Sequence, residues 1–218
     1  MNDLQKKGVL VNIRHAESEW NLLGIWTGIT DVNITEKGRA DAEKVGELLR
    51  GFTFDIAYTS DLKRTKQTLD HLLHGKGDQH QLTRIGHKAL TERDYGELTG
   101  KNKWQVQQEI GDEAFTGIRR GWDYPVPGGE RLKQVHGRVV SYFDDEILPR
   151  LMRGEHVLLV AHGNSLRVLM KHLEDIDEEH MADVEMPFGE AHIYTFEPGV
   201  IKPISKEIRR AEITKTHA

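Results

Sequence analysis

The amino-acid sequence predicts an α/β fold with a mostly parallel central sheet and helices on both faces. Short apolar segments rich in β-branched residues alternate with longer segments whose apolar residues recur every three or four positions. Such alternation is typical of a parallel sheet covered by helices. The segment at 155–161 is also an almost continuous apolar run, as expected for a central parallel strand that is buried on both faces.

The N-terminal half predicts strands and helices in turn. A strand at 9–13 is β-branched and too short to be a helix. Thr35 is a suitable N-cap for a helix, and Ser60 or Asp61 is suitable for the next one. In chain order we expect a strand at 9–13, a loop at 16–34, a helix from about 35 to 51, a strand at 54–59 and a helix from about 61 to 77.

The C-terminal half continues the same pattern with a longer irregular segment in its middle. Pro125, Pro127 and two glycines mark a connection at 124–129. In chain order we expect an irregular edge strand within 82–92, an ordered loop at 90–103, two short helices over 103–121 broken near Gly111, a long helix from about 130 to 148, a strand at 155–161, a helix directly after 162 and a last strand at 192–196.

Composition indicates an ordinary globular chain. It has 218 residues, of which 37% are hydrophobic and 30% are charged, enough for a sizeable core. No linker, repeat or low-complexity segment divides it. We therefore expect a single domain over 1–218, with a tail from about 204 that is either mobile or folded over the site. The absence of cysteine excludes disulfides and thiolate chemistry.

Charge and hydropathy limit the kinds of partner. A formal net charge of -5 argues against the broad basic face of a nucleic-acid binder, whereas local positive clusters suit a small anionic, phosphorylated ligand. No signal-peptide pattern is visible, and the apolar run at 157–161 is too short to span a bilayer. We expect a cytoplasmic protein with no nucleic-acid or membrane partner, and a homo-oligomer stays open.

Histidines follow two of the predicted strands. Arg14 and His15 come directly after the first strand, and His162 follows the strand at 155–161. Ligands of open α/β sheets bind at this carboxyl edge. Arginine presents a fork of donors that fits phosphate oxygens, and a largely neutral imidazole can be a nucleophile at neutral pH. An isolated Arg-His pair is more often a surface feature, so this interpretation depends on further groups.

Arg64 supplies such a group, because it lies in the first turn of the helix after the second strand. A helix N-terminus already favours anions, so a cation there is out of place unless an anion is bound. A lone arginine would otherwise be interpreted as solvated. The parallel sheet brings His15, Arg64 and His162 to one edge, where they would surround one small anion.

Two motifs now resemble those of a known family. The segment 14–21 resembles the Arg-His-Gly motif of the histidine phosphatase superfamily, and 161–165 resembles its second-histidine motif. Within the superfamily, the sequence is most similar to cofactor-dependent phosphoglycerate mutases over residues 8 to about 197. It departs from them at Ala16, which replaces glycine, at Asp94, where histidine is frequent, and at Phe188, where a small hydroxyl residue is common and the pocket would be narrowed.

The resemblance implies a phosphoglycerate mutase-like fold and interconversion of 3-phosphoglycerate and 2-phosphoglycerate in glycolysis and gluconeogenesis. It implies that 2,3-bisphosphoglycerate phosphorylates His15, that Glu92 is the general acid and base, and that no metal takes part. Arg14, Arg64 and His162 would neutralise the phosphoryl oxygens. The substrate contacts that it implies are Asn21, Thr27, Gly28, Tyr95, Lys103, Arg119, Arg120, Gly163 and Asn164.

Three functions stay open at this stage. The first is the mutase, the second is a histidine-type phosphatase acting on small phosphorylated metabolites, and the third is a non-catalytic binding module. Without the resemblance, Glu92 is better explained by a salt bridge to Arg93. The same holds for three cations, which are then better explained as solvated helix charges: Lys103, Arg119 and Arg120. If they act together, they favour the mutase, since a substrate with two anionic groups needs a second positive cluster.

Overall fold

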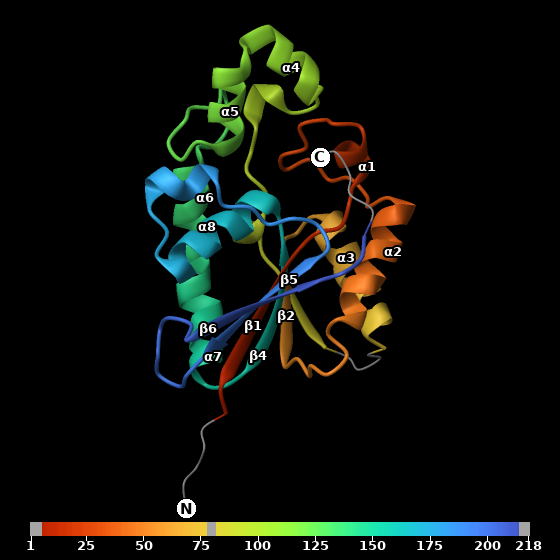
Figure 1. Cartoon of the computed structure of the whole chain (residues 1–218), viewed down its shortest axis with the longest axis vertical. Helices are drawn as coiled ribbons and strands as arrows, with labels where there is room; N and C mark the ends of the chain where they lie inside the picture. The colour runs from red at the N-terminus through yellow and green to blue at the C-terminus, as the bar shows by residue number, and fades with distance from the viewer. Residues whose placement is uncertain (1–5, 78–81, 214–218) are drawn as a thin grey trace, which may run out of the picture.

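The computed structural model describes residues 6–77 and 82–213, and its centre is a six-stranded sheet with the order β3-β2-β4-β1-β5-β6 (Figure 1). Strands β1 (Gly8–Arg14), β2 (Ile56–Thr59), β3 (Thr83–Gly86) and β4 (His156–Ala161) are parallel. Strand β5 (Glu190–Phe196) runs antiparallel to β1, and β6 (Ser205–Arg210) runs antiparallel to β5. The predicted mostly parallel α/β sheet is therefore confirmed.

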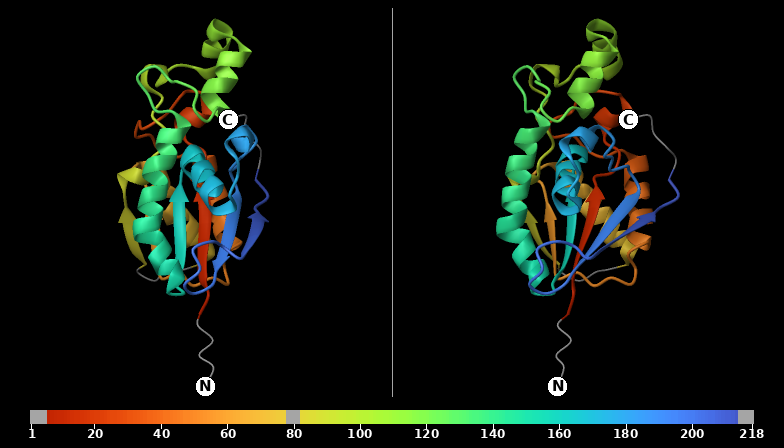
Figure 2. Two further views of the ribbon diagram at one scale, coloured as in Figure 1. Left: turned by 90° about the vertical axis from the view of Figure 1, so that its left-hand side faces the viewer. Right: turned by 60° about the vertical axis from the view of Figure 1, so that its left-hand side comes forward.

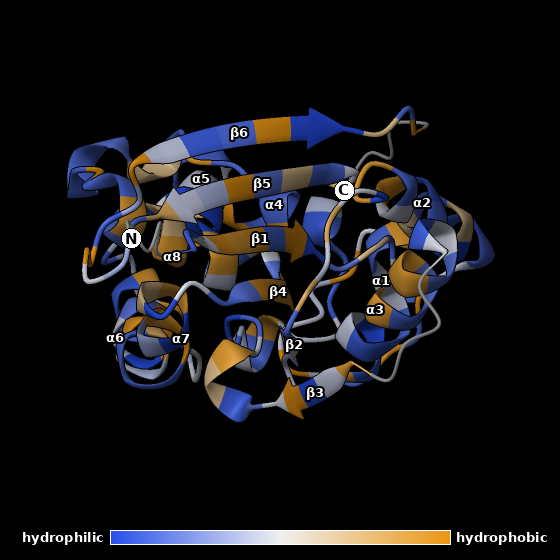
Figure 3. Ribbon diagram, turned by 90° about the horizontal axis from the view of Figure 1, so that it is seen from below, coloured by the Kyte–Doolittle hydropathy of each residue, from blue (hydrophilic) through white to orange (hydrophobic). Residues whose placement is uncertain are grey.

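Helices cover both faces of the sheet, as Figures 2 and 3 show. Helices α2 (Glu36–Glu47) and α3 (Lys63–Lys76) pack on one face, and α6 (Leu132–Tyr142), α7 (Leu148–Met152) and α8 (Gly163–Glu174) cover the other. In β4, Leu158 belongs to the hydrophobic core under α2 and α3, and Leu159 belongs to the core under α6, α7 and α8. This two-sided burial is the reason for the continuous apolar run in the sequence.

The helix that was expected from about 130 to 148 is one helical run with a wider turn inside it. The π-helical turn η3 (Phe143–Ile147) joins α6 to α7, and Pro149 lies in the first turn of α7. Proline has no backbone N–H to donate and its ring disturbs the preceding helical turn, and the wider turn η3 directly precedes it.

Helix α3 begins differently from the prediction. Its N-cap is Leu62, which provides no side-chain cap, so the prediction of Ser60 or Asp61 in that role is wrong. The Ser60 hydroxyl accepts a hydrogen bond from the Leu62 N–H at 3.2 Å, but it also contacts the His162 ring. The side chain of Ser60 therefore serves the histidine as well as the start of the helix.

Strand β6 is absent from the sequence-based expectation, which assigns everything after about 204 to a tail. Its sequence, Ser-Lys-Glu-Ile-Arg-Arg, has no apolar alternation, and its side chains are mostly exposed. It is an edge strand held by its ladder with β5. Because backbone hydrogen bonds are independent of side-chain type, a charged edge strand leaves little trace in a hydropathy pattern.

Shorter elements build the region above the carboxyl edge of the sheet. Helices α4 (Lys103–Ile110) and α5 (Asp112–Arg120) project there (Figure 1), and the predicted break at Gly111 is confirmed. Gly111 has a φ of +82°, which favours glycine. The remaining short elements are α1 (Glu19–Leu22), η1 (Lys88–Leu90), η2 (Gly96–Leu98) and η4 (Glu178–Ala182).

The register of β1 against β4 places the two motif histidines together. Arg14 lies opposite Ala161, so His15 and His162 are the next residues of two adjacent parallel strands. The His15 N–H donates to the Ala161 carbonyl at 2.9 Å, and the two ring centres are 5.0 Å apart. The sheet thus brings together residues that are 147 positions apart in the chain.

Candidate functional site

A pocket of about 650 Å³ lies at the carboxyl edge of the parallel strands, below α4 and α5. Its lining comes from the end of β1, the first turns of α3, α4 and α8, the loops after β1 and η1, the end of α5, the segment 185–190 and the chain at the end of β6. The predicted residues that line it are Arg14, His15, Asn21, Thr27, Gly28, Arg64, Glu92, Tyr95, Lys103, Arg119, Arg120, Gly163 and Asn164.

His15 is oriented by its own backbone neighbourhood. Its Nδ1 lies 2.7 Å from the Ala16 carbonyl oxygen, so Nδ1 carries the proton and Nε2 keeps a free lone pair. Burial, followed by the positive charges of Arg64 and Arg14, lowers the pKa of His15 well below its usual range. The imidazole is therefore neutral at physiological pH, which is the state a nucleophile needs.

His162 lies behind the pocket lining rather than in it. Its ring is fully buried, and its Nδ1 accepts a hydrogen bond from Arg64 Nε at 3.2 Å. Nε2 lies 2.7 Å from the Ser60 hydroxyl, to which it donates when the ring is neutral. Burial and then Arg64 lower the pKa of His162 well below its usual range. In this geometry, His162 orients Arg64 and presents no free nitrogen to a ligand.

The two buried histidines should make the protein sensitive to acid. Below about pH 6.5, histidines of an unfolded chain bind protons that the folded chain excludes. The free energy of unfolding should then decrease as the pH is lowered, by up to about 1.4 kcal/mol per pH unit for each histidine. Urea unfolding at about pH 7.5 and about pH 5.5 measures this slope. His15→Asn should reduce the slope, and an unchanged slope would show that His15 contributes none of it.

Arg14 and Phe188 form one wall of the pocket. The Arg14 guanidinium carbon lies 3.9 Å from the centre of the Phe188 ring, and Nη1 donates to the Met186 carbonyl. The Phe188 ring is also 5.9 Å from the His15 ring, so Phe188 narrows the space beside the histidine. Ala16 causes no strain, because among the described residues other than glycine a positive φ occurs only at Asp175.

Glu92 lies where the first turn of α8 meets the pocket. Its Oε1 accepts hydrogen bonds from the backbone N–H of Arg93 at 2.7 Å and of Asn164 at 3.2 Å. A Cβ on Gly163 would lie 3.4 Å from Arg14 Nε and 3.6 Å from Glu92 Oε2. Gly163 therefore lies next to both Arg14 and the second carboxylate oxygen of Glu92.

The alternative explanation of Glu92 as the salt-bridge partner of Arg93 is wrong. The Arg93 guanidinium donates to three backbone carbonyls, those of Ile118, Tyr124 and Glu130. Among the donors of Arg93, only its backbone N–H contacts the Glu92 carboxylate. The second oxygen, Oε2, is left facing the pocket side near Gly163.

A second group of cations faces the pocket from α4 and α5. Lys103 is only 9% exposed, and burial, then Arg119 and Arg14, lower its pKa to about 8. Burial and then Arg120 also lower the pKa of Arg119. A buried lysine with a lowered pKa is not a solvated helix charge, so that explanation is wrong for Lys103. Arg120 is half-buried and pairs with Glu185.

Sequence reasoning missed four polar residues of the pocket, which are Arg167, Glu185, Glu190 and Arg210. Arg167 is buried, donates to Asn164 Oδ1 at 2.9 Å and to the Val184 carbonyl at 2.7 Å, and burial lowers its pKa to about 10. An arginine inside the apolar stripe of a helix was the available signal. Glu185 lies in an irregular loop whose sequence gave none.

The described part of the tail reaches this pocket. Ala211 and Ile213 contribute to its lining, and a Cβ on Gly189 would lie 2.6 Å from the Ile213 side chain. Of the two alternatives for the tail, the described residues therefore fit the folded one at the rim of the site. Residues 214–218 lie outside the described part.

Residues 6–77 and 82–213 contain neither a candidate membrane span nor a cluster of metal-binding side chains. None of the helices there is long and apolar enough to cross a membrane. No group of three or more His, Asp or Glu side chains in these ranges is placed to hold a metal ion. The expectation of a reaction without metal stays a prediction.

The fold and the pocket together define an α/β protein whose pocket combines a buried neutral histidine with converging arginines. The model of the histidine phosphatase superfamily (branch 1) matches residues 10–205. The chain belongs to this superfamily.

Individual relatives agree with this assignment. The chain is 44% identical over 188 residues to a protein of Cytophaga hutchinsonii and 45% identical over 188 residues to one of Nitrobacter winogradskyi, both named 2,3-bisphosphoglycerate-dependent phosphoglycerate mutase. These matches cover 86% and 85% of this chain, and 87% and 90% of the relatives. Among solved structures, Bacillus stearothermophilus YhfR is similar with a TM-score of 0.73 and 27% identity, covering 91% of this chain and 98% of its own.

Proposed function

We propose that this chain is a 2,3-bisphosphoglycerate-dependent phosphoglycerate mutase, which interconverts 3-phosphoglycerate and 2-phosphoglycerate. The observation that carries the proposal is the presence of two cation groups on one pocket. Arg14 and Arg64 lie beside His15, and Lys103 with Arg119 lies on the α4–α5 side. A ligand with two separate anionic groups fits this arrangement, and relatives that match most of the chain bear the name of this enzyme.

His15 is the proposed nucleophile of the reaction. Its free Nε2 forms a bond to phosphorus while the bond from phosphorus to the leaving oxygen breaks, and 2,3-bisphosphoglycerate supplies this first phosphoryl group. Phosphoryl transfer needs mainly positioning and neutralisation of charge. Arg14, Arg64 and the first N–H groups of α8 provide these for the transferring oxygens.

Glu92 is the proposed carrier of the proton. It gives a proton to the oxygen that leaves phosphorus and takes one from the hydroxyl that attacks the phosphorylated His15 in return. Its Oε1 is already held by two backbone N–H groups, so Oε2 is the atom available for this exchange. The proposed role of His162 is to orient Arg64, which differs from the expectation of a direct contact with the phosphoryl group.

The remaining predicted contacts line the same pocket, and their proposed role is to hold the substrate. Tyr95 accepts a hydrogen bond from Asn164 at 2.9 Å, and the Gly28 carbonyl accepts one from Arg64 at 2.8 Å. Asn21 and Thr27 are further polar residues of the lining. A cytoplasmic location, where glycolytic intermediates occur, is part of the same proposal.

The test is an assay of purified protein with 3-phosphoglycerate in the presence and absence of 2,3-bisphosphoglycerate. A mutase forms 2-phosphoglycerate, and this activity rises when the bisphosphate is added. Release of inorganic phosphate from several phosphate esters, without any 2-phosphoglycerate, would replace the proposal with a phosphatase. Activity that a chelator removes and manganese restores would contradict the metal-free mechanism.

Lys103→Met should affect mutase turnover more than hydrolysis of the phosphorylated enzyme. Hydrolysis needs only water after the first transfer. The mutase must keep the bisphosphorylated intermediate bound while this intermediate reorients in the pocket. Loss of one desolvated charge-assisted contact should cost about 1.5–3 kcal/mol, or roughly ten- to a hundredfold. Both activities are measured in one buffer, with the exposed Lys101→Met as control. Equal losses in both activities would show that Lys103 supports only binding or folding.

The lowered pKa of Lys103 adds a pH dependence to this prediction. Above about pH 8 the amine of the free enzyme loses its charge, so the affinity for 3-phosphoglycerate should weaken as pH rises. Lys103→Arg keeps its charge in this range and should remove that decline.

A further inference from the structure

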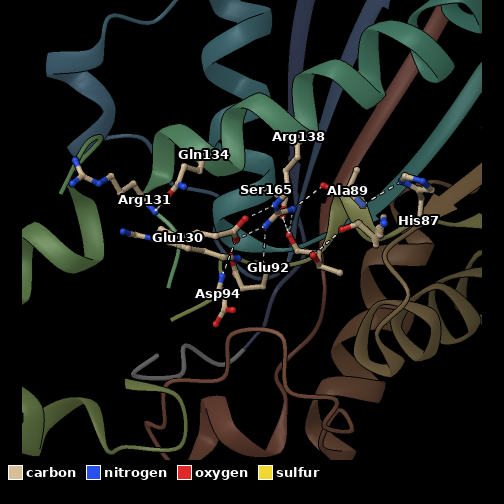
Figure 4. A network of polar contacts seen from close by, with 12 residues as sticks. His87, Ala89, Glu92, Asp94, Glu130, Arg131, Gln134, Arg138 and Ser165 are labelled. Atoms are coloured by element: carbon tan, nitrogen blue, oxygen red, sulfur yellow. Dashed lines mark hydrogen bonds and ion pairs between the residues drawn. The ribbon is translucent and has the colours of Figure 1, made fainter. Parts of the chain in front are cut away.

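Arg138 lies at the centre of a polar network that the proposed reaction leaves without a role (Figure 4). It comes from α6 and uses all five of its N–H groups. Nη1 donates to the carbonyls of Ala89 and Thr91 at 2.8 and 2.9 Å, and Nη2 donates to the Glu92 carbonyl at 3.0 Å. The remaining two N–H groups, on Nε and Nη2, donate to the Glu130 carboxylate at 2.8 and 2.9 Å.

Glu130 extends the network to the other side of Glu92. Its Oε2 accepts a hydrogen bond from the Asp94 N–H at 2.9 Å, and its own N–H donates to the Asp94 carbonyl at 2.9 Å. Its carbonyl accepts a hydrogen bond from Arg93 Nε at 2.6 Å. Arg138 therefore binds the chain before and at Glu92, and Glu130 binds it directly after.

The segment around Glu92 depends on these contacts because it has no strand neighbour. Residues 91–95 lie between two short 3₁₀ turns, η1 and η2, and belong to no ladder of the sheet. The Thr91 carbonyl, which Arg138 also binds, accepts a hydrogen bond from the Ser165 hydroxyl of α8 at 2.6 Å. Side chains of α6 and α8 thus set the position of the backbone that bears Glu92.

We propose that Arg138 and Glu130 are positioning residues for the proton transfer by Glu92. This inference rests on the proposed function. Neither residue lines the pocket, so both act through the backbone of 89–94 rather than on a substrate. A general acid must lie within hydrogen-bond distance of the oxygen that it protonates, and a misplacement of about 1 Å can cost about a hundredfold in rate.

The test compares leaving groups of different basicity. p-Nitrophenyl phosphate releases a stable phenolate and needs no proton from Glu92, whereas a sugar-like or glycerate alkoxide needs one. Arg138→Gln and Glu130→Gln should lower kcat for the mutase about ten- to a hundredfold, with KM for 3-phosphoglycerate changed less. Phosphorylation of His15 by p-nitrophenyl phosphate should stay within about threefold of wild type. A loss of the same size with both substrates would overturn the inference.

Arg138→Lys is the second variant, because it keeps the charge and a similar length and so favours folding. One ammonium cannot replace five N–H groups in a fixed fork, so it should restore little of the mutase turnover. Full rescue by lysine would show that only the charge matters and would contradict a positioning role. The control is Arg131→Gln, since Arg131 lies just before the same helix and pairs with the exposed Asp123.

A double mutant separates this inference from the proposed function. If Arg138 acts through Glu92, Arg138→Gln should add little further loss to Glu92→Gln, because residues that act as one unit are not additive. A full additional loss in the double mutant would overturn the inference alone. Normal mutase turnover in Glu92→Gln would instead contradict the role of Glu92 in the proposed function.

Discussion

Replacing His15 by asparagine is expected to lower mutase turnover by at least about 10⁴-fold, as the loss of a nucleophile does in other enzymes with covalent intermediates. The side chain is buried among Arg14, Arg64 and His162, and asparagine is small enough to occupy this space. Its amide cannot form the phosphorylated intermediate, so the chemistry is lost while the pocket keeps its lining.

The decisive measurement is the phosphorylated protein itself. Wild type incubated with 2,3-bisphosphoglycerate should carry phosphate that is lost in acid and stable in alkali, as phosphohistidine is. His15→Asn should carry none. His71→Asn serves as control, because His71 lies on α3 and pairs with Glu43 away from the pocket. Phosphate retained in His15→Asn would move the nucleophile to another residue.

The central part of the fold follows from the sequence because burial leaves a trace in hydropathy. Strands β1 and β4 are largely apolar on both faces. Arg14 ends β1, and His15 and His162 directly follow the two strands. Their convergence is then a consequence of parallel pairing. Strand β6 could not be predicted in this way, because its residues Ser205–Arg210 are largely exposed and its ladder involves backbone atoms alone.

The pattern of residues gives less information about hydrogen-bond partners. Lys103 and Arg120 lie at the pocket, but only the structure shows that Lys103 is buried while Arg120 pairs with Glu185. The contacts of Arg138 to the carbonyls of 89–92 join positions 46 to 49 residues apart. No local periodicity encodes such contacts, since a carbonyl acceptor is present at every residue.

The position of His162 illustrates the same limit at the site. Its place after β4 is evident from the sequence, and a direct contact with an anion is the natural expectation. The structure instead occupies both ring nitrogens, one with Arg64 and the other with Ser60. The Ser60 hydroxyl also lies 2.9 Å from the Thr65 hydroxyl, and this chain of partners at the start of α3 fixes the tautomer of the ring.

Glu92→Gln should lower mutase turnover about 10²- to 10⁴-fold, the usual contribution of a general acid or base. The amide oxygen of glutamine can still accept hydrogen bonds from the N–H groups of Arg93 and Asn164, so the side chain should keep its place. What it loses is the ability to give and take a proton. The affinity for 3-phosphoglycerate should therefore change much less than turnover.

The dependence on leaving group decides whether the proton is what matters in this variant. Transfer of phosphate from p-nitrophenyl phosphate to His15 releases an oxygen of low basicity, and it should remain within about tenfold of wild type in Glu92→Gln. Transfer from 2,3-bisphosphoglycerate releases a strongly basic alkoxide and should show the full loss. The matched control is Glu97→Gln, a nearby glutamate that does not line the pocket. If both donors lost the same factor, Glu92 would be acting on the charge or geometry of the pocket, because a proton donor is needed only where the departing oxygen is too basic to leave without one.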